Sequence, residues 1–291
     1  MIKKYVITGA AGFIGKNLVK DLLSQKKSKI YLILRKSKKN QILSKKFTKE
    51  PNYIPIFFKD SNELKKKFRK INADVVINLA THYVDKHNFE DLEKIVSSNI
   101  LFCSQILELS CERKIKSFIN ICSVMQLYTH NKYPLNFYAA SKDSFKNIGS
   151  FYSKIYGIKF FNLFIGDTYG DNDERKKIIP IILKNYKKNK TTKIMKRKLE
   201  LNILHVKDII NAISIILWKK IKPGDYLVRS KINIKLHRLI SNINKVLKRK
   251  IKIIWGNSKF IKVRKINMRL LPGWKQNFNI ETEIKKYLNE N

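Results

Sequence analysis

A tyrosine and a lysine four residues apart, Tyr138 and Lys142, are the side chains of this sequence best suited to proton transfer. At the start of a predicted helix, this spacing places both on one face and one turn apart. An ammonium beside a phenol favours the phenolate, so the pair could give or take a proton near neutral pH. The spacing is common on helices, but here it follows the fifth strand of a predicted cofactor-binding sheet. We therefore predict that both side chains are catalytic.

A glycine-rich loop between an apolar strand and an amphipathic helix predicts where a cofactor binds. Residues 8–15 read Thr-Gly-Ala-Ala-Gly-Phe-Ile-Gly. Gly9 permits a tight turn, Gly12 lets backbone approach a diphosphate, and Gly15 lets the helix pack closely on the strand. The helix N-terminus then offers amide groups and a positive dipole end to the phosphates. An ordinary glycine-rich turn is the alternative, and the flanking strand and helix favour the dinucleotide loop.

Apolar strands alternate with helices through the first half of the chain. This alternation predicts a doubly wound parallel α/β sheet of the Rossmann type, with its ligand crevice at the carboxyl ends of the strands. Strands are predicted at residues 5–8, 30–34, 53–58, 73–80, 117–123 and 159–164, and helices from about residue 12 and at 62–70, 89–113 and 137–156. We predict a dinucleotide-binding domain over residues 1–165.

The alternation loosens after Gly166, where we predict a smaller substrate-binding region over residues 166–291 with segments that return to the main domain. Helices are expected near 178–188 and from a cap at Asp208 to Trp218.

Composition bounds the remaining classes of function. The formal charge of +40 raises nucleic acid or an acidic membrane as partners. The lysines are spread over polar helix faces and loops without a basic arm, so we interpret them as solvated surface with no specific nucleic-acid target. The N-terminus leaves no room for a signal peptide, and no stretch is apolar enough to span a bilayer. Three cysteines fit reduced thiols, so we expect a cytoplasmic protein with no metal site.

Several segments together resemble the extended short-chain dehydrogenase/reductase superfamily, in its NAD-dependent epimerase/dehydratase group that acts on nucleotide sugars. The resemblance covers nearly the whole chain and is carried by residues 8–15, 78–80, 99, 138–142 and 205–208. Residues 137–142, 167–177 and 271–275 resemble more narrowly the branch of CDP-abequose and CDP-paratose synthases, which are 4-ketoreductases of deoxysugar pathways.

The resemblance implies three catalytic positions. In the superfamily a hydroxyl after the fifth strand hydrogen-bonds the reacting oxygen, the tyrosine exchanges a proton, and the lysine holds the cofactor ribose. Tyr138 and Lys142 match, whereas the hydroxyl position falls on Val124, one residue after Ser123. Ser123 is our candidate, a strand-end serine bonded to backbone is the alternative, and Gln126 could substitute as a donor to the substrate.

Cofactor choice is predicted at the end of the second strand. An acidic residue there would bind the ribose of NAD, but the chain has Arg35, which favours the 2′-phosphate of NADP(H), with NAD as the alternative. We expect Asp60 to contact the adenine, and Ala80 and Thr81 to lie beside the cofactor. Asn99 is expected to have a structural role that supports these residues. The full predicted cofactor set is Gly9, Ala11, Gly12, Phe13, Ile14, Gly15, Arg35, Asp60, Leu79, Ala80, Thr81, Asn99, Tyr138 and Lys142.

The predicted function is reduction of a 4-keto nucleotide-diphosphate sugar, in deoxysugar or surface polysaccharide biosynthesis. Asp167 stands where relatives usually carry Asn, and Arg175 suits the substrate phosphates because its planar fork is bidentate. The alternatives are an NAD-dependent epimerase, or a non-catalytic Rossmann protein that binds nucleic acid through its lysines. Many relatives dimerise through two helices per subunit, and apolar positions near Ile95, Leu101, Ile148 and Phe151 are compatible with a homodimer.

Overall fold

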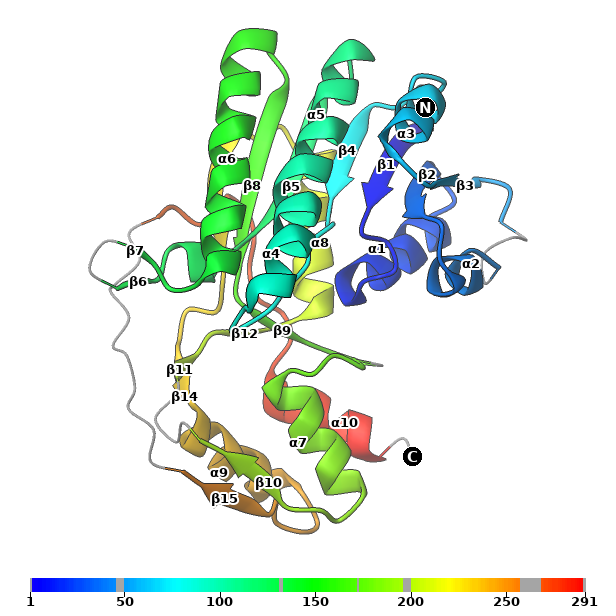
Figure 1. Ribbon diagram of the computed structural model, residues 1–291. Helices are drawn as coiled ribbons and strands as arrows, with labels where there is room; N and C mark the ends of the chain where they lie inside the picture. The colour runs from blue at the N-terminus through cyan, green and yellow to red at the C-terminus, as the bar shows by residue number, and fades with distance from the viewer. Residues whose placement is uncertain are drawn as a thin grey trace. The chain divides into compact units, whose positions relative to one another are not determined.

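The computed structural model describes residues 2–45, 50–130, 133–171, 173–195, 200–256 and 268–289. The chain divides into two compact units, and a seven-stranded sheet forms the centre of the first unit (Figure 1). The strand order is β13-β8-β5-β4-β1-β2-β3, and the pairings from β3 through β1 to β5 are parallel. The strands are β1 (Lys3–Thr8), β2 (Ser28–Arg35), β3 (Tyr53–Phe58), β4 (Val75–Asn78), β5 (Ser117–Ser123), β8 (Lys159–Ile165) and β13 (Gly224–Val228).

Helices cover this sheet because its strands are apolar along most of their length. The helices are α1 (Phe13–Ser24), α2 (Lys38–Lys45), α3 (Ser61–Phe68), α4 (Phe89–Val96), α5 (Phe102–Glu112) and α6 (Phe137–Tyr156). One core cluster joins α3, α5 and α6 to the sheet through buried rings such as Phe118, Phe145 and Phe160. A Cβ on Gly149 of α6 would lie 2.0 Å from the Phe160 ring, so glycine allows this helix to pack closely on β8.

The second unit comprises Ile165–Trp218, Val228–Lys265 and Leu270–Asn291. Its described core is rich in isoleucine, with members from α7, α9 and α10. Its elements are β9 (Asp167–Tyr169), α7 (Ile178–Lys187), β10 (Thr192–Ile194), β11 (Glu200–Leu201), β12 (Ile203–His205), α8 (Val206–Trp218), β14 (Ile234–Lys235), α9 (Leu236–Val246), β15 (Ile253–Trp255) and α10 (Ile280–Asn289). The first unit also contains two short strands, β6 (Thr129–His130) and β7 (Tyr133–Pro134), which pair with each other.

The predicted doubly wound α/β fold is confirmed, and β3, β5 and α6 have the predicted bounds. Helix α2 was not predicted, and the helix expected over residues 89–113 is divided by a π turn at Ser97–Leu101. The expected cap at Asp208 is wrong, because α8 begins at Val206. Asp208 lies in the first turn, where its carboxylate accepts the backbone N–H of Asn277 at 2.8 Å. This long-range role leaves no local signal in the sequence.

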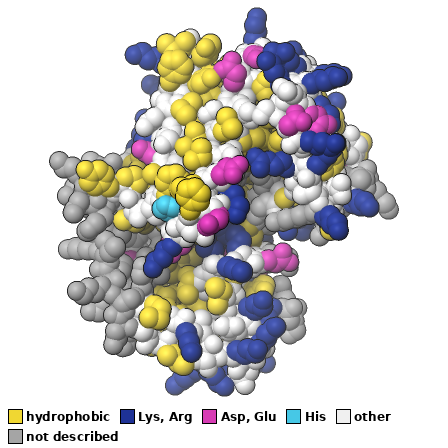
Figure 2. Space-filling model, viewed as in Figure 1, with side chains coloured by type: hydrophobic (Ala, Val, Ile, Leu, Met, Phe, Trp, Pro, Cys, Tyr) yellow, Lys and Arg dark blue, Asp and Glu magenta, His cyan; other side chains and the backbone are white. Residues whose placement is uncertain are grey.

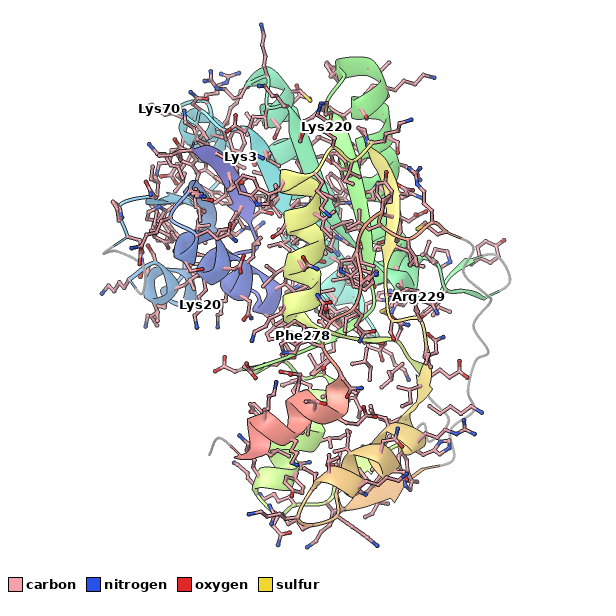
Figure 3. The ribbon with its side chains drawn as sticks, turned by 180° about the vertical axis from the view of Figure 1, so that it is seen from behind. Lys3, Lys20, Lys70, Lys220, Arg229 and Phe278 are labelled. Carbon is pink, nitrogen blue, oxygen red and sulfur yellow. The ribbon has the colours of Figure 1, made fainter. Side chains whose placement is uncertain are left out.

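Basic side chains are distributed over many elements of the molecule. Figure 2 shows Lys and Arg scattered between polar and apolar side chains on the face in view. Lys3 on β1, Lys20 on α1 and Lys70 after α3 lie on separate elements of the first unit (Figure 3). This spread is typical of solvated lysine surfaces. Among the described helices, none combines the length and apolarity that crossing a bilayer requires.

Candidate active site

The loop after β1 fits closely against the segment that follows β4, the point where the strand order of the sheet reverses. Gly9 has φ +67°, and a Cβ there would lie 2.5 Å from the carbonyl carbon of Leu79. A Cβ on Gly15 would lie 2.4 Å from the carbonyl oxygen of Gly9. Only glycine fits at these two positions, so this part of the loop is shaped by backbone contacts alone.

The N-terminus of α1 is suited to an anion. Gly12 is its N-cap, no side chain of the described residues caps it, and its first turn holds no acidic residue. The backbone amides and the positive end of the helix dipole are therefore available for phosphate groups. Ala11, Phe13 and Ile14 are half-buried around this turn. This cradle fits the diphosphate of a dinucleotide.

Tyr138 and Lys142 lie on the first turns of α6, which Asn136 caps by accepting the N–H of Ala139 at 2.9 Å. Tyr138 is 8% exposed, and its ring meets the Tyr83 ring edge-on with centroids 4.9 Å apart. Lys142 is only 2% exposed, and no residue in the described ranges hydrogen-bonds or ion-pairs with its ammonium. Burying an unpaired charge is costly, so this ammonium is arranged for a polar ligand.

The structure distinguishes the three candidates for the donor at the end of β5. Ser123 Oγ accepts the N–H of Met125 at 3.2 Å and retains its own proton for donation. Val124 is buried in a small core cluster, so the position at which the resemblance implies a hydroxyl packs as core here. Gln126 accepts the N–H of Ser123 through Oε1 at 2.9 Å, while its buried Nε2 has no hydrogen-bond partner among the described residues. Two hydrogen-bond donors, from Ser123 and Gln126, therefore remain.

Asn99 fixes the loop that follows β4. It lies on the π turn, and its Oδ1 accepts the N–H of His82 at 2.7 Å and the hydroxyl of Thr81 at 3.1 Å. Its Nδ2 donates to the His82 carbonyl at 3.1 Å and to Ser141 Oγ at 2.9 Å. Because every polar group of this amide is used, Asn99 ties the loop to α6 near Tyr138. Sequence reasoning missed Ser141 and Tyr83 as supports, since both act through tertiary contacts.

Arg35 and Asp60 meet at a pocket of about 250 Å³ beyond the ends of β2 and β3. No described residue pairs with the exposed guanidinium of Arg35. Asp60 caps α3 by accepting the N–H of Glu63 at 2.8 Å, which leaves other lone pairs of its carboxylate. The pocket could hold an adenosine. Its lining consists of Arg35, Phe58, Lys59, Asp60, Ser61, Ser97, Leu101, Phe102 and Gln105.

The substrate candidates Asp167 and Arg175 belong to the second unit. Burial raises the pKa of Asp167, and the nearby positive charges of Lys177 and Arg175 partly oppose this. The Arg175 fork is closed on Asp173, with Nε 2.7 Å from Oδ1 and Nη2 2.6 Å from Oδ2. The two groups of this fork that suit bidentate phosphate binding are thus already paired. Asn172, in the same motif, lies outside the described residues.

Comparison with known proteins shows the family to which the sequence is similar. The model of the family described as "NAD dependent epimerase/dehydratase family" matches residues 5–228. The CDP-abequose synthase of Yersinia pseudotuberculosis is 29% identical over 212 residues, 72% of this chain and 71% of that protein. The CDP-abequose synthase of Salmonella muenchen is 26% identical over 298 residues and covers 98% of this chain, which covers 97% of that protein.

Many solved structures share the fold, and two of them illustrate it. A UDP-glucuronic acid 4-epimerase from Bacillus cereus, in complex with UDP-glucuronic acid and NAD, has a TM-score of 0.81 at 18% identity, with 99% of each chain covered. A dTDP-glucose 4,6-dehydratase from Bacillus anthracis, in complex with NAD, has a TM-score of 0.82 at 20% identity, with 99% of this chain and 97% of that chain covered.

Proposed function

Because this chain belongs to the NAD dependent epimerase/dehydratase family and is an enzyme with a nicotinamide cofactor, we propose that it reduces the 4-keto group of a nucleotide-diphosphate sugar. The observation that carries the proposal is the buried pair on α6, Tyr138 with Lys142, whose ammonium has no partner in the described part of the chain. The likeness to the CDP-abequose synthase of Salmonella muenchen over almost the full length supports a sugar nucleotide as substrate.

Each residue of the pair has a separate task in this proposal. A bound, reduced nicotinamide supplies the hydride for the carbonyl carbon. The Tyr138 phenol donates its proton to the oxygen of that carbonyl, and Lys142 binds the cofactor ribose and keeps the phenol competent for transfer. Ser123 Oγ and Gln126 Nε2 are the donors that would stabilise the developing negative charge on the oxygen.

The cofactor proposed is NADPH. The carboxyl end of β2 presents Arg35, whose guanidinium has no partner among the described residues, at the 250 Å³ pocket, where a ribose 2′-phosphate would be bound bidentately. Asp167 and Arg175 stay predictions as substrate contacts. For Arg175 to bind phosphates, its fork must open from Asp173.

A homodimer is proposed through α5 and α6. Two of the four positions named from sequence are not available, since Ile95 is buried and Ile148 packs against the core. The other two, Leu101 on the π turn before α5 and Phe151 on α6, are exposed. Val96 at the end of α4 and Ile155 and Tyr156 on α6 are also at least 40% exposed, and Figure 2 shows hydrophobic side chains gathered over the end of α6.

Size-exclusion chromatography with light scattering measures the molar mass of the protein in solution and so tests the dimer. Phe151→Glu should shift that mass towards the monomer. A monomeric wild-type protein would contradict the proposal.

An assay with NADPH and a panel of 4-keto nucleotide sugars tests the reaction. A reductase consumes NADPH in proportion to product, whereas an epimerase retains its cofactor and shows no net oxidation. The solved structures with the same fold include a UDP-glucuronic acid 4-epimerase, so the second outcome is the main competitor. Net oxidation with none of the keto sugars would contradict the proposed reduction.

A further inference from the structure

A row of hydrogen-bonded side chains crosses five neighbouring strands of the sheet. On β1, Thr8 Oγ1 donates to Oδ1 of Asn78 on β4 at 2.6 Å, and Asn78 Nδ2 donates to Oδ1 of Asn120 on β5 at 3.2 Å. Asn120 Nδ2 donates to Oδ1 of Asn162 on β8 at 2.8 Å, and Asn162 Nδ2 donates to Oδ1 of Asp225 on β13 at 2.8 Å. The first four side chains are at most 1% exposed. We name these five residues the amide row.

The amide row has one direction, because every donor points towards β13. An asparagine side chain can be turned to exchange its donor and acceptor, so internal amides alone do not fix a direction. A carboxylate accepts and does not donate, which makes Asp225 the group that orients the row. With this orientation the Thr8 proton is committed to Asn78, and Thr8 Oγ1 accepts the N–H of Ala80 at 3.2 Å.

The Thr8 end of the row joins the two loops of the cofactor site. Thr8 directly precedes Gly9, and Ala80 directly follows Leu79, whose carbonyl carbon would be 2.5 Å from a Cβ on Gly9. The hydrogen bond from the Ala80 N–H to Thr8 Oγ1 therefore sets the distance between the glycine loop and the segment after β4. A buried polar network with all members satisfied is rigid, whereas one missing acceptor leaves a costly unpaired donor.

Two buried thiols contact the row, and the charge of Lys142 acts on the pKa of both. Cys103 hydrogen-bonds Asn78, and Cys122 hydrogen-bonds Asn162. Burial raises the pKa of the Cys122 thiol to about 12, with Lys142 opposing the rise and Asp225 adding to it. Burial raises the pKa of Cys103 too, again opposed by Lys142. The charge of Lys142, the residue expected to bind the cofactor ribose, thus lowers the pKa of both thiols that contact the row.

We propose that Asp225 is a positioning residue for the cofactor, which acts through the amide row on the glycine loop. The inference rests on the proposed cofactor site. It concerns a side chain on β13, at the edge of the sheet, that takes no part in the proposed reaction.

The test compares Asp225→Leu, which removes the acceptor, with Asp225→Asn, which has the same shape and can turn its amide oxygen towards Asn162 Nδ2, so that this donor stays paired. NADPH affinity should fall about tenfold in Asp225→Leu, the factor equivalent to 1.4 kcal/mol, and should return to within about twofold of wild type in Asp225→Asn. Ser110→Ala is the control, since Ser110 is a buried polar side chain of α5 that bonds the Ile106 carbonyl of its own helix and lies outside the row. Equal affinity in Asp225→Leu and Ser110→Ala would overturn the proposal.

A second measurement needs neither cofactor nor substrate, so it separates this inference from the proposed function. Hydrogen exchange of the Ala80 backbone amide should be about tenfold faster in Asp225→Leu than in Ser110→Ala, because the Thr8 acceptor is no longer held. If Asp225→Leu does not fold, the wild-type protein remains decisive. The side-chain amide protons of Asn78, Asn120 and Asn162 should then exchange slowly, and exchange at the rate of surface asparagines would overturn the proposal.

Discussion

Replacing Gly9 with alanine should damage the cofactor loop far more than the same change at a glycine of equal backbone geometry. Gly9 has φ +67° and Gly157 has φ +70°, so alanine at either position incurs a left-handed backbone penalty of about 1–2 kcal/mol. A Cβ on Gly157 would meet nothing within 4 Å, whereas on Gly9 it would lie 2.5 Å from the Leu79 carbonyl carbon. Forcing backbone apart adds about 1–3 kcal/mol.

Urea unfolding of the two variants measures this difference directly. Gly9→Ala should lose about 2–5 kcal/mol of unfolding free energy and Gly157→Ala about 1–2 kcal/mol. Calorimetric titration with NADPH should show at least tenfold weaker binding for Gly9→Ala and wild-type affinity for Gly157→Ala. If both variants lose the same stability and bind NADPH equally, the close contact between the two loops does not shape the site.

Three further changes test separate parts of the site. Ser123→Ala should lower turnover by a factor equivalent to about 2–4 kcal/mol with unchanged NADPH affinity, and near-wild-type turnover would remove Ser123 from the mechanism. Arg35→Ala should weaken NADPH by about 1.5–3 kcal/mol and leave NADH unaffected, whereas equal losses would refute a 2′-phosphate contact. Burial lowers the pKa of His205 in the folded protein. As the pH falls below about 6.5, the pKa of histidine in the unfolded chain, the unfolded chain binds this proton more readily than the folded protein, and the free energy of unfolding decreases. The melting temperature of His205→Phe should therefore drop less than that of wild type between about pH 7.5 and 5.5, and an identical drop would contradict this assignment.

Local periodicity explains which elements the sequence predicts well. The bounds of β5 and α6 follow from an apolar run and a helical pattern that lie within single segments. The glycine loop was likewise readable, because its spacing, strand and helix are contiguous.

Tertiary pairings explain what the sequence leaves out. The amide row depends on the register of strands that are far apart in the chain, although an asparagine inside each of three apolar strands was a usable signal. Asn162 reaches Asp225 across 63 residues, and Asn99 reaches Ser141 across 42. The ion pair between Arg175 and Asp173 joins residues only two apart in the chain. The planar shape of the guanidinium, taken alone, predicted that Arg175 is available to bind the substrate phosphates.

The proton-transfer role of the α6 pair is tested most directly by Tyr138→Phe in the reductase assay. The phenylalanine ring keeps the edge contact with Tyr83 and removes only the hydroxyl. With a 4-keto nucleotide sugar that the wild type reduces, NADPH oxidation should fall by at least 100-fold, in the range expected for loss of a general acid, while NADPH affinity is retained. Oxidation of NADPH at the wild-type rate by Tyr138→Phe would contradict the account.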